Sequence, residues 1–198
     1  MQKSVAVLWT GKEILTDKKL VRTIGIMFFL TLTTLGAFVY LRLPFTPVPL
    51  TLQTFFVLLS GAFLRRREAI FAQASYLGLG LCGLPIFSAS GAGLTRLFGP
   101  TGGYLVGFIF SAVVVSSIVG FFARKGKTGF IISLLAMFSG IAVIYFFGAL
   151  WLGLFLKYSF SQSMLLGVLP FIPGDILKIF SAAIIFSKAN SRMANLFK

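Results

Sequence analysis

Long stretches without a charged residue dominate the chain, and short polar or basic stretches separate them. A helix needs about 20 residues to cross the ~30 Å hydrocarbon core of a bilayer. Six stretches approach that length, namely residues 23–41, 50–64, 69–87, 104–123, 128–152 and 164–187. The second is short, and Pro170, Pro173 and Gly174 interrupt the sixth. The pattern predicts an all-α integral membrane protein with six transmembrane helices.

The composition points to the same class. Hydrophobic residues make up 58% of the 198-residue chain, and only 11% of the residues are charged. Soluble globular domains contain about 25% charged residues, so the water-soluble class is excluded. Residues 1–22 are polar and of mixed charge, without the apolar core and small-residue cleavage site of a signal peptide. We therefore expect them to remain as a segment outside the membrane.

Basic residues gather on one side of the predicted membrane. When successive loops are assigned alternately to the two sides, one side receives both ends of the chain and the basic loops at 65–67 and 124–127. The other side receives only Arg42, Arg96 and Lys157. Because positively charged loops stay in the cytoplasm, both termini are expected to be cytoplasmic. The predicted parts are a cytoplasmic N-terminal segment at 1–22, a six-helix transmembrane domain at 23–187 and a cytoplasmic tail at 188–198.

The sequence lacks the residues that several classes of function require. The net charge of +14 comes without the Lys/Arg stripe and interleaved aromatics of a nucleic-acid surface. Histidine is absent and Cys82 is the single cysteine, so the sequence predicts neither a disulfide nor a metal site. Gly126-Lys127-Thr128 resembles the end of a phosphate loop, but Phe121 stands where that loop needs glycine. With four acidic residues and no catalytic set, we expect no enzyme and no bound cofactor.

The loops on the less basic side are the elaborate ones. Loop 42–49 contains three prolines, which stop a helix and favour a stiff extended conformation. Loop 88–103 is long and rich in glycine, which suits close approach of the backbone to a ligand or a movable lid. We therefore expect a binding site on this face.

An acid and a base, Asp175 and Lys178, lie three residues apart inside the last apolar stretch. Residues at i and i+3 share a helix face, so the two side chains can reach each other and a common ligand. An ionised group in hydrocarbon costs about 2.5–3.5 kcal/mol even on the insertion scale. We interpret the pair as the wall of a small-molecule site. The alternative is a mutually neutralising pair that only fixes helix packing.

Four segments together resemble the BioY family: 47–54 (PVPLTLQT), 83–87 (GLPIF), 97–108 (LFGPTGGYLVGF) and 170–178 (PFIPGDILK). BioY proteins are the biotin-specific S components of energy-coupling-factor (ECF) transporters, and the resemblance covers about residues 23–187. It implies a multi-pass bundle in the bacterial cytoplasmic membrane that captures biotin at its outer face. It also implies a transmembrane coupling protein and ATPase subunits as partners, with membrane lipid around the bundle.

The resemblance implies roles for the charged candidates. Asp175, an acceptor, suits the two ureido N–H groups of biotin. Lys178 can donate to the ureido carbonyl or to the carboxylate of biotin, and this choice stays open. Arg96 is the other cation expected to bind the carboxylate of biotin. The alternatives for Arg96 are a solvated charge in the loop or a contact with lipid phosphate.

The uncharged candidates carry alternatives as well. Gln53 can bind either end of the ureido group or form a hydrogen bond between helices. Tyr104 can stack on the bicyclic ring, offer its hydroxyl to the ligand, or belong to an interfacial aromatic belt. Thr101 and Gly103 can supply backbone N–H groups. Ser88 follows the third helix, where family members often have an asparagine, and is expected to hydrogen-bond the ligand.

Other functions remain open at this point. The chain could be an S component for another vitamin or small solute. A lipid-acting membrane enzyme is a further alternative, although the sequence is poor in catalytic groups. A purely structural membrane protein would bind no small solute tightly.

Overall fold

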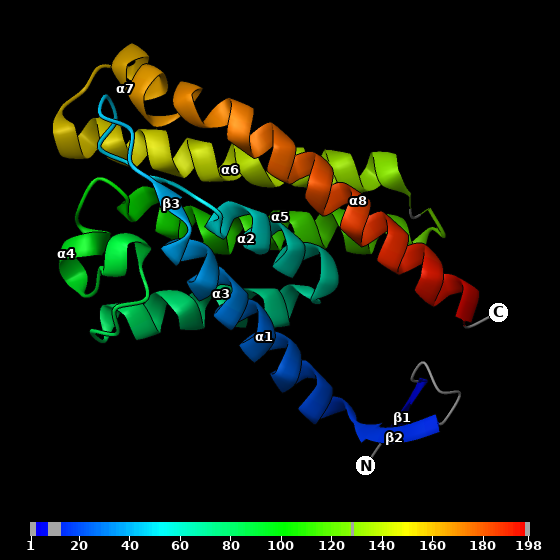
Figure 1. Cartoon of the computed structure of the whole chain (residues 1–198). Helices are drawn as coiled ribbons and strands as arrows, with labels where there is room; N and C mark the ends of the chain where they lie inside the picture. Colours follow the sequence, from blue (N-terminus) through cyan, green and yellow to red (C-terminus); the bar gives the residue numbers. More distant parts are fainter. Residues whose placement is uncertain (1–2, 8–12, 128, 197–198) are drawn as a thin grey trace.

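The computed structural model describes residues 3–7, 13–127 and 129–196, most of them helical (Figure 1). The long helices are α1 (Lys18–Phe38), α2 (Gln53–Phe63), α3 (Arg66–Leu81), α5 (Gly102–Arg124), α6 (Phe130–Leu156) and α8 (Ile172–Leu196). The short helices are η1 (Ser88–Ser90), α4 (Leu94–Leu97), α7 (Phe160–Gly167) and η2 (Leu169–Phe171). Two small antiparallel hairpins pair β1 (Lys3–Val7) with β2 (Glu13–Asp17) and β3 (Tyr40–Leu41) with β4 (Leu50–Thr51).

Four helical segments are long and apolar enough to cross a membrane, namely Lys19–Phe38, Gly102–Arg124, Phe130–Leu156 and Phe160–Asn190. The apolar helix Gln53–Phe63 is shorter. Large apolar residues face outward from the bundle, for example Phe146, which is 64% exposed, and Leu154, which is 71% exposed. Such faces suit lipid rather than water. The chain is thus a mostly helical membrane protein, and each of the six apolar stretches contains a helix.

Helices α5 and α6 form the most extensive helix pair of the bundle. Helices α2 and α3 pack on α5, α8 packs on α6 and α2, and α1 covers α2 and α3. The β1–β2 hairpin and the end of α8 lie at one end of the bundle, and α4 and α7 lie at the opposite end (Figure 1). The arrangement therefore has two chemically distinct ends, one of which carries the elaborate loops.

The expected element boundaries differ from the structure at several points, among them the start of α2 and both ends of α3. Helix α1 begins at Lys18, so the expected 1–22 segment contains its first turn as well as the β1–β2 hairpin. Loop 88–103 contains two short helices, and residues 102 and 103 already belong to α5. The sixth stretch is broken into α7, η2 and α8 at its prolines, as expected for residues that interrupt a helix. The described residues do not include 1–2, 8–12, 128 and 197–198. Parts of the predicted N-terminal segment, the C-terminal tail and the fifth stretch therefore lie outside them.

Close approach between α5 and α6 depends on glycine. A Cβ atom on Gly103 would overlap the carbonyl oxygen of Phe147 and the side chain of Trp151 on α6. One turn later, a Cβ on Gly107 would lie 3.1 Å from the Cα of Ile144. This Gly-x-x-x-Gly face lets the two backbones meet, as small residues do between helices in membranes.

The first prediction concerns this contact. Gly103→Ala should destabilise the protein by about 1–3 kcal/mol, because the new methyl group meets backbone that cannot move aside. Gly120→Ala is the matched control on the same helix, since nothing lies within 4 Å of a Cβ there. Removing a helical glycine at that position should leave stability unchanged or raise it by up to about 1 kcal/mol. Thermal unfolding of both variants in detergent measures the difference, and equal midpoints would show that α5 and α6 are not packed as described.

Candidate functional site

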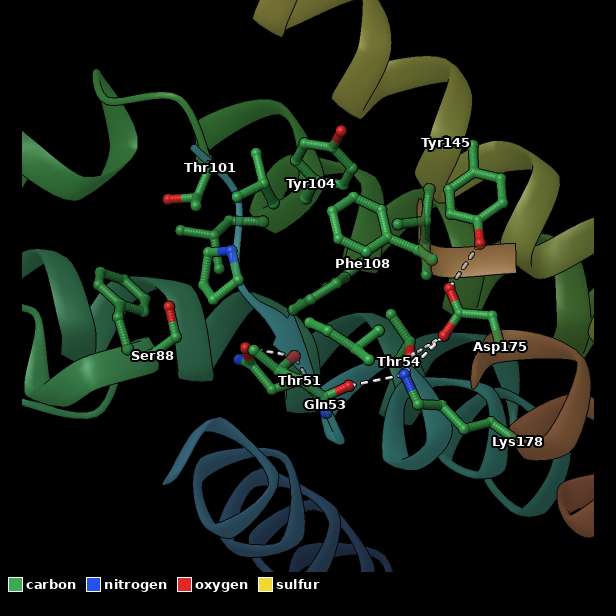
Figure 2. Close-up of a pocket in the computed structure, with 17 residues that line it drawn as sticks. Thr51, Gln53, Thr54, Ser88, Thr101, Tyr104, Phe108, Tyr145, Asp175 and Lys178 are labelled. Atoms are coloured by element: carbon green, nitrogen blue, oxygen red, sulfur yellow. Dashed lines mark hydrogen bonds and ion pairs between the residues drawn. The ribbon is translucent and has the colours of Figure 1, made fainter. Parts of the chain in front are cut away.

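A pocket opens beside the start of α8, between the β3–β4 loop, α2, α5 and α6 (Figure 2). We call it the Asp175 pocket. Its cavity volume is about 50 Å³. Small-molecule sites usually have about 300–1,000 Å³, so side chains that line this pocket must move before a drug-sized ligand fits.

The charged pair forms one wall of this pocket. Pro173 occupies the first turn of α8, where its fixed φ angle suits a helix start, and Asp175 follows in the same turn. The Nζ atom of Lys178 lies 2.6 Å from Oδ1 of Asp175. Only 4% of the Asp175 side chain and 11% of the Lys178 side chain are exposed. The predicted i, i+3 pair is therefore present, buried, and next to a cavity.

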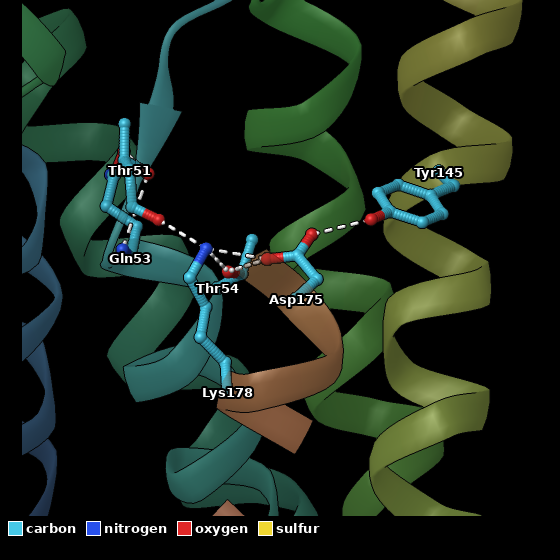
Figure 3. Close-up of polar contacts among 6 residues, drawn as sticks. All are labelled: Thr51, Gln53, Thr54, Tyr145, Asp175 and Lys178. Atoms are coloured by element: carbon cyan, nitrogen blue, oxygen red, sulfur yellow. Dashed lines mark hydrogen bonds and ion pairs between the residues drawn. The ribbon is translucent and has the colours of Figure 1, made fainter. Parts of the chain in front are cut away.

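Three other groups complete the hydrogen bonds of the pair (Figure 3). The hydroxyl of Thr54 donates to Oδ1 of Asp175 at 3.1 Å, and the hydroxyl of Tyr145 donates to Oδ2 at 2.7 Å. The ammonium of Lys178 donates to the carbonyl oxygen of Thr51 at 2.7 Å and to the hydroxyl of Thr54 at 3.1 Å. Buried ions are tolerated only when paired and hydrogen-bonded in this way.

The rest of the lining is largely apolar and aromatic. Side chains of this kind come from the β3–β4 loop, α5, α6 and η2, and they include Leu50, Leu105, Phe108, Ile144 and Phe171. An apolar cavity with a few convergent polar groups is typical of a site for an amphipathic small molecule. The polar wall offers both acceptors and donors, so it can bind a group that carries N–H and C=O together.

Gln53 lines the pocket, but its amide is already engaged. Its Nε2 donates to the hydroxyl of Tyr76 at 2.6 Å, and its Oε1 accepts from the hydroxyl of Thr51 at 3.1 Å. The Tyr76 hydroxyl in turn donates to the carbonyl of Ile86. The helix–helix hydrogen bond considered for Gln53 is therefore present between α2 and α3. It also supports the segment before Ser88.

Ser88, Thr101 and Tyr104 all line the pocket as well (Figure 2). The Tyr104 hydroxyl donates to the carbonyl of Gly167 at 2.5 Å, which ties α5 to the end of α7. Tyr104 is 7% exposed, so it is a core residue rather than part of an exposed aromatic belt. Its ring, rather than its hydroxyl, is what remains for a ligand.

Two sequence candidates do not line this pocket. Gly103 is the second residue of α5, where it serves the close contact with α6, and its N–H group lies in the first helical turn without an intrahelical acceptor. Arg96 lies on α4, with its side chain against Gly91. The ligand contacts expected of these two residues stay predictions without support from the pocket lining.

Sequence analysis missed two members of the polar wall, Thr54 and Tyr145. Thr54 sits within a quoted motif of the chain, but nothing in the pattern separated it from its neighbours. Tyr145 carries the hydroxyl nearest the centre of an apolar helix, and that isolation was an available signal. Among the described residues, no group of three or more His, Cys, Asp or Glu side chains is placed to hold a metal ion.

Comparison with known proteins identifies the family and its relatives. The model of the BioY family matches residues 10–195. The probable biotin transporter BioY of Pyrococcus horikoshii is 38% identical over 157 residues, which cover 79% of this chain and 88% of that protein. The biotin transporter BioY of Thermotoga maritima matches with the same identity and the same coverage.

A solved structure shares the fold. It is the crystal structure of the S-component for biotin from an ECF-type ABC transporter, with a TM-score of 0.83 and 22% sequence identity. The similarity covers 90% of this chain and 95% of that one. At this identity the likeness concerns the fold, while the family rests on the sequence matches. On those matches, the chain belongs to the BioY family.

Proposed function

We propose that the chain captures biotin and takes part in its uptake as the S component of an ECF transporter. The observation that carries this function is the buried Asp175–Lys178 pair in the wall of a largely apolar pocket. The chain belongs to the BioY family, and the similar proteins compared above are named biotin transporters. The buried, hydrogen-bonded pair alone would also fit a packing role, so the adjoining pocket favours the binding role.

The ureido group of biotin carries two N–H donors and one carbonyl acceptor, which complement the polar wall. An ionised carboxylate has about four lone-pair sites. Thr54 and Lys178 use those of Oδ1 in Asp175, whereas Oδ2 accepts only from Tyr145. Oδ2 therefore keeps a site for one ureido N–H group. A second N–H contact, or a carbonyl contact with Lys178, requires one of the present hydrogen bonds to exchange for the ligand.

The apolar lining suits the bicyclic ring of biotin. Phe108, Phe171 and Ile144 face the same cavity as the polar wall. Removing apolar surface from water contributes about 25 cal/mol per Å², so the ring adds affinity while the ureido group sets orientation. Ser88 and Thr101 offer further hydroxyls at the opposite side of the pocket (Figure 2). The carboxylate of biotin is left for Lys178 or Arg96.

The orientation in the membrane follows from the distribution of charge. The basic loops at 65–67 and 124–127 lie at the end of the bundle opposite to α4 and α7. The end with α4 and α7 carries Arg42 and Arg96. The positive-inside rule then assigns the chain ends to the cytoplasm and the Asp175 pocket to the outer half of a bacterial cytoplasmic membrane. With α2 and α3 included, we infer six membrane-embedded segments. Transport energy would come from a coupling protein and ATPase subunits, in line with the incomplete phosphate loop at 126–128.

The second prediction tests the ureido contact. Asp175→Asn should weaken biotin binding tenfold or more, because a hydrogen bond to a charged group is worth about 1.5–3 kcal/mol. Arg96→Ala should weaken it less, since Arg96 lies outside the pocket lining. Isothermal titration of biotin into both purified variants gives the order, and thermal unfolding checks that each is folded. The opposite order would contradict the role of Asp175, and tighter binding of another vitamin by the wild-type chain would contradict biotin itself.

The third prediction tests orientation with the single native cysteine. Cys82 is exposed at the end of α3, on the side of the bundle that carries α4. A membrane-impermeant maleimide should therefore label Cys82 in intact spheroplasts and should not label Cys82→Ser. In the Cys82→Ser background, Thr95→Cys should react from outside, whereas Lys125→Cys should react only after permeabilisation. Labelling of Lys125→Cys in intact spheroplasts would reverse the proposed orientation.

A further inference from the structure

A second hollow lies at the other end of the bundle, between α1, the α2–α3 turn and the last turns of α5. We call it the arginine hollow. Five arginines line it, against one acidic residue: Arg22, Arg65, Arg66, Arg67, Arg124 and Glu68. Its atom-free space is about 1620 Å³, including the part open to solvent. The hollow is therefore wide, open and strongly positive.

Most of this positive charge has no acidic partner among the described side chains. Arg22 pairs with Glu68, with 3.3 Å between Nε and Oε1. Among the side chains that the structure describes, no carboxylate pairs with Arg66 or Arg124. The N-terminus of α3 adds positive potential, because its first backbone N–H groups have no intrahelical acceptor and no side chain caps them. Backbone N–H groups and the helix dipole at such a terminus favour an anion, above all a phosphate.

Glu68 shows that a phosphate alone does not complete the site. This residue lines the hollow and is only 9% exposed. Its Oε2 is buried without a hydrogen-bond partner in the described part of the chain. A buried carboxylate oxygen requires a donor, and leaving it unpaired is costly. The occupant should therefore carry a hydrogen-bond donor close to its negative charge.

The depth of the hollow indicates where that occupant comes from. Helix α2 has 11 residues, so it spans about 16 Å at ~1.5 Å per residue. This is shorter than the ~30 Å hydrocarbon core. Gly61 of α2 packs against Val115 of α5. Helix α5 continues past this contact to Arg124, whereas α2 ends at Phe63. The turn at 65–67 is therefore recessed relative to the end of α5. Phe63 and Phe121 line the same hollow with 40% and 53% exposure, and they extend its wall onto the apolar helix faces. A molecule with acyl chains can lie along those faces, whereas a soluble phosphate cannot use them.

We propose that the arginine hollow binds the headgroup of phosphatidylglycerol from the cytoplasmic leaflet. Its phosphodiester lies against the α3 N-terminus and the arginines, and a glycerol hydroxyl donates to Oε2 of Glu68. The net charge of −1 suits the positive hollow better than a zwitterionic headgroup, and basic pockets on the cytoplasmic side commonly hold anionic lipid. The leaflet depends on the proposed orientation, but the site does not depend on the ligand of the Asp175 pocket.

The test uses native mass spectrometry on the delipidated full-length protein, titrated with phosphatidylglycerol or phosphatidylcholine. Wild-type protein should bind one phosphatidylglycerol at least tenfold more tightly than phosphatidylcholine. Each juxtamembrane arginine contributes about fivefold in affinity, so Arg66→Gln/Arg124→Gln should weaken phosphatidylglycerol binding about 25-fold. Arg42→Gln/Lys157→Gln removes the same charge at the other end and should change it less than twofold. Biotin binding should be unchanged in the Arg66/Arg124 variant, which separates this site from the proposed transport function.

Two further arms decide the chemistry. Glu68→Gln should narrow the preference for phosphatidylglycerol over phosphatidylmethanol, which has the same charge but no headgroup hydroxyl. Glycerol 3-phosphate should fail to displace the lipid at equal concentration. Equal binding of all phospholipids, wild-type affinity in the Arg66/Arg124 variant, or displacement by glycerol 3-phosphate would each overturn the proposal. So would a variant that keeps its lipid and loses only assembly with the coupling protein, since the arginines would then form a protein interface.

Discussion

An acid and a base held away from water govern how this bundle is assembled. The ion pair of Asp175 and Lys178 is stable in an apolar surrounding only if further hydrogen bonds from the protein compensate the two charges. Those hydrogen bonds come from the segment before α2, from α2 itself and from α6, through Thr51, Thr54 and Tyr145. The pair therefore fixes the start of α8 against two other helices, and the fold cannot place it elsewhere without leaving a buried charge unpaired.

The same requirement creates a site next to the pair. Hydroxyl and carbonyl groups hydrogen-bond the two charges from one side, and the apolar side chains on the other side offer no hydrogen bond. Asp175 keeps unused acceptor capacity on Oδ2, because Tyr145 supplies a single hydrogen bond there. A buried acceptor that is only partly used binds a donor more strongly than an exposed one, since water competes less at low dielectric. The packing role and the binding role of the pair are thus compatible.

Sequence alone predicted the parts of this picture that depend on local spacing. Charged residues are rare in apolar stretches, so Asp175 and Lys178 stood out, and their i, i+3 spacing was enough to bring them together. Thr54 and Tyr145 were not predictable in the same way, because hydroxyl groups are ordinary in membrane helices and their role depends on which helices become neighbours. The role of Gly103 could not be decided from sequence for a similar reason: glycine suits both a loop and a close helix contact, and only the position of α6 distinguishes the two.

The contacts that hold each wall of the Asp175 pocket determine which parts of it can adjust to a ligand. Gly61 brings α2 against α5, with a Cβ there 2.8 Å from the Cβ of Val115, and Gly103 and Gly107 bring α5 against α6. Helices joined by glycine contacts cannot change their spacing without opening voids or overlapping backbone. Three walls of the Asp175 pocket are therefore preformed. The β3–β4 loop is held differently, by single hydrogen bonds such as that from Thr46 to the carbonyl of Leu166. Adjustment to a ligand must then come from this loop and from the side chains of Lys178 and Tyr145, since each can exchange one hydrogen bond for another without moving a helix.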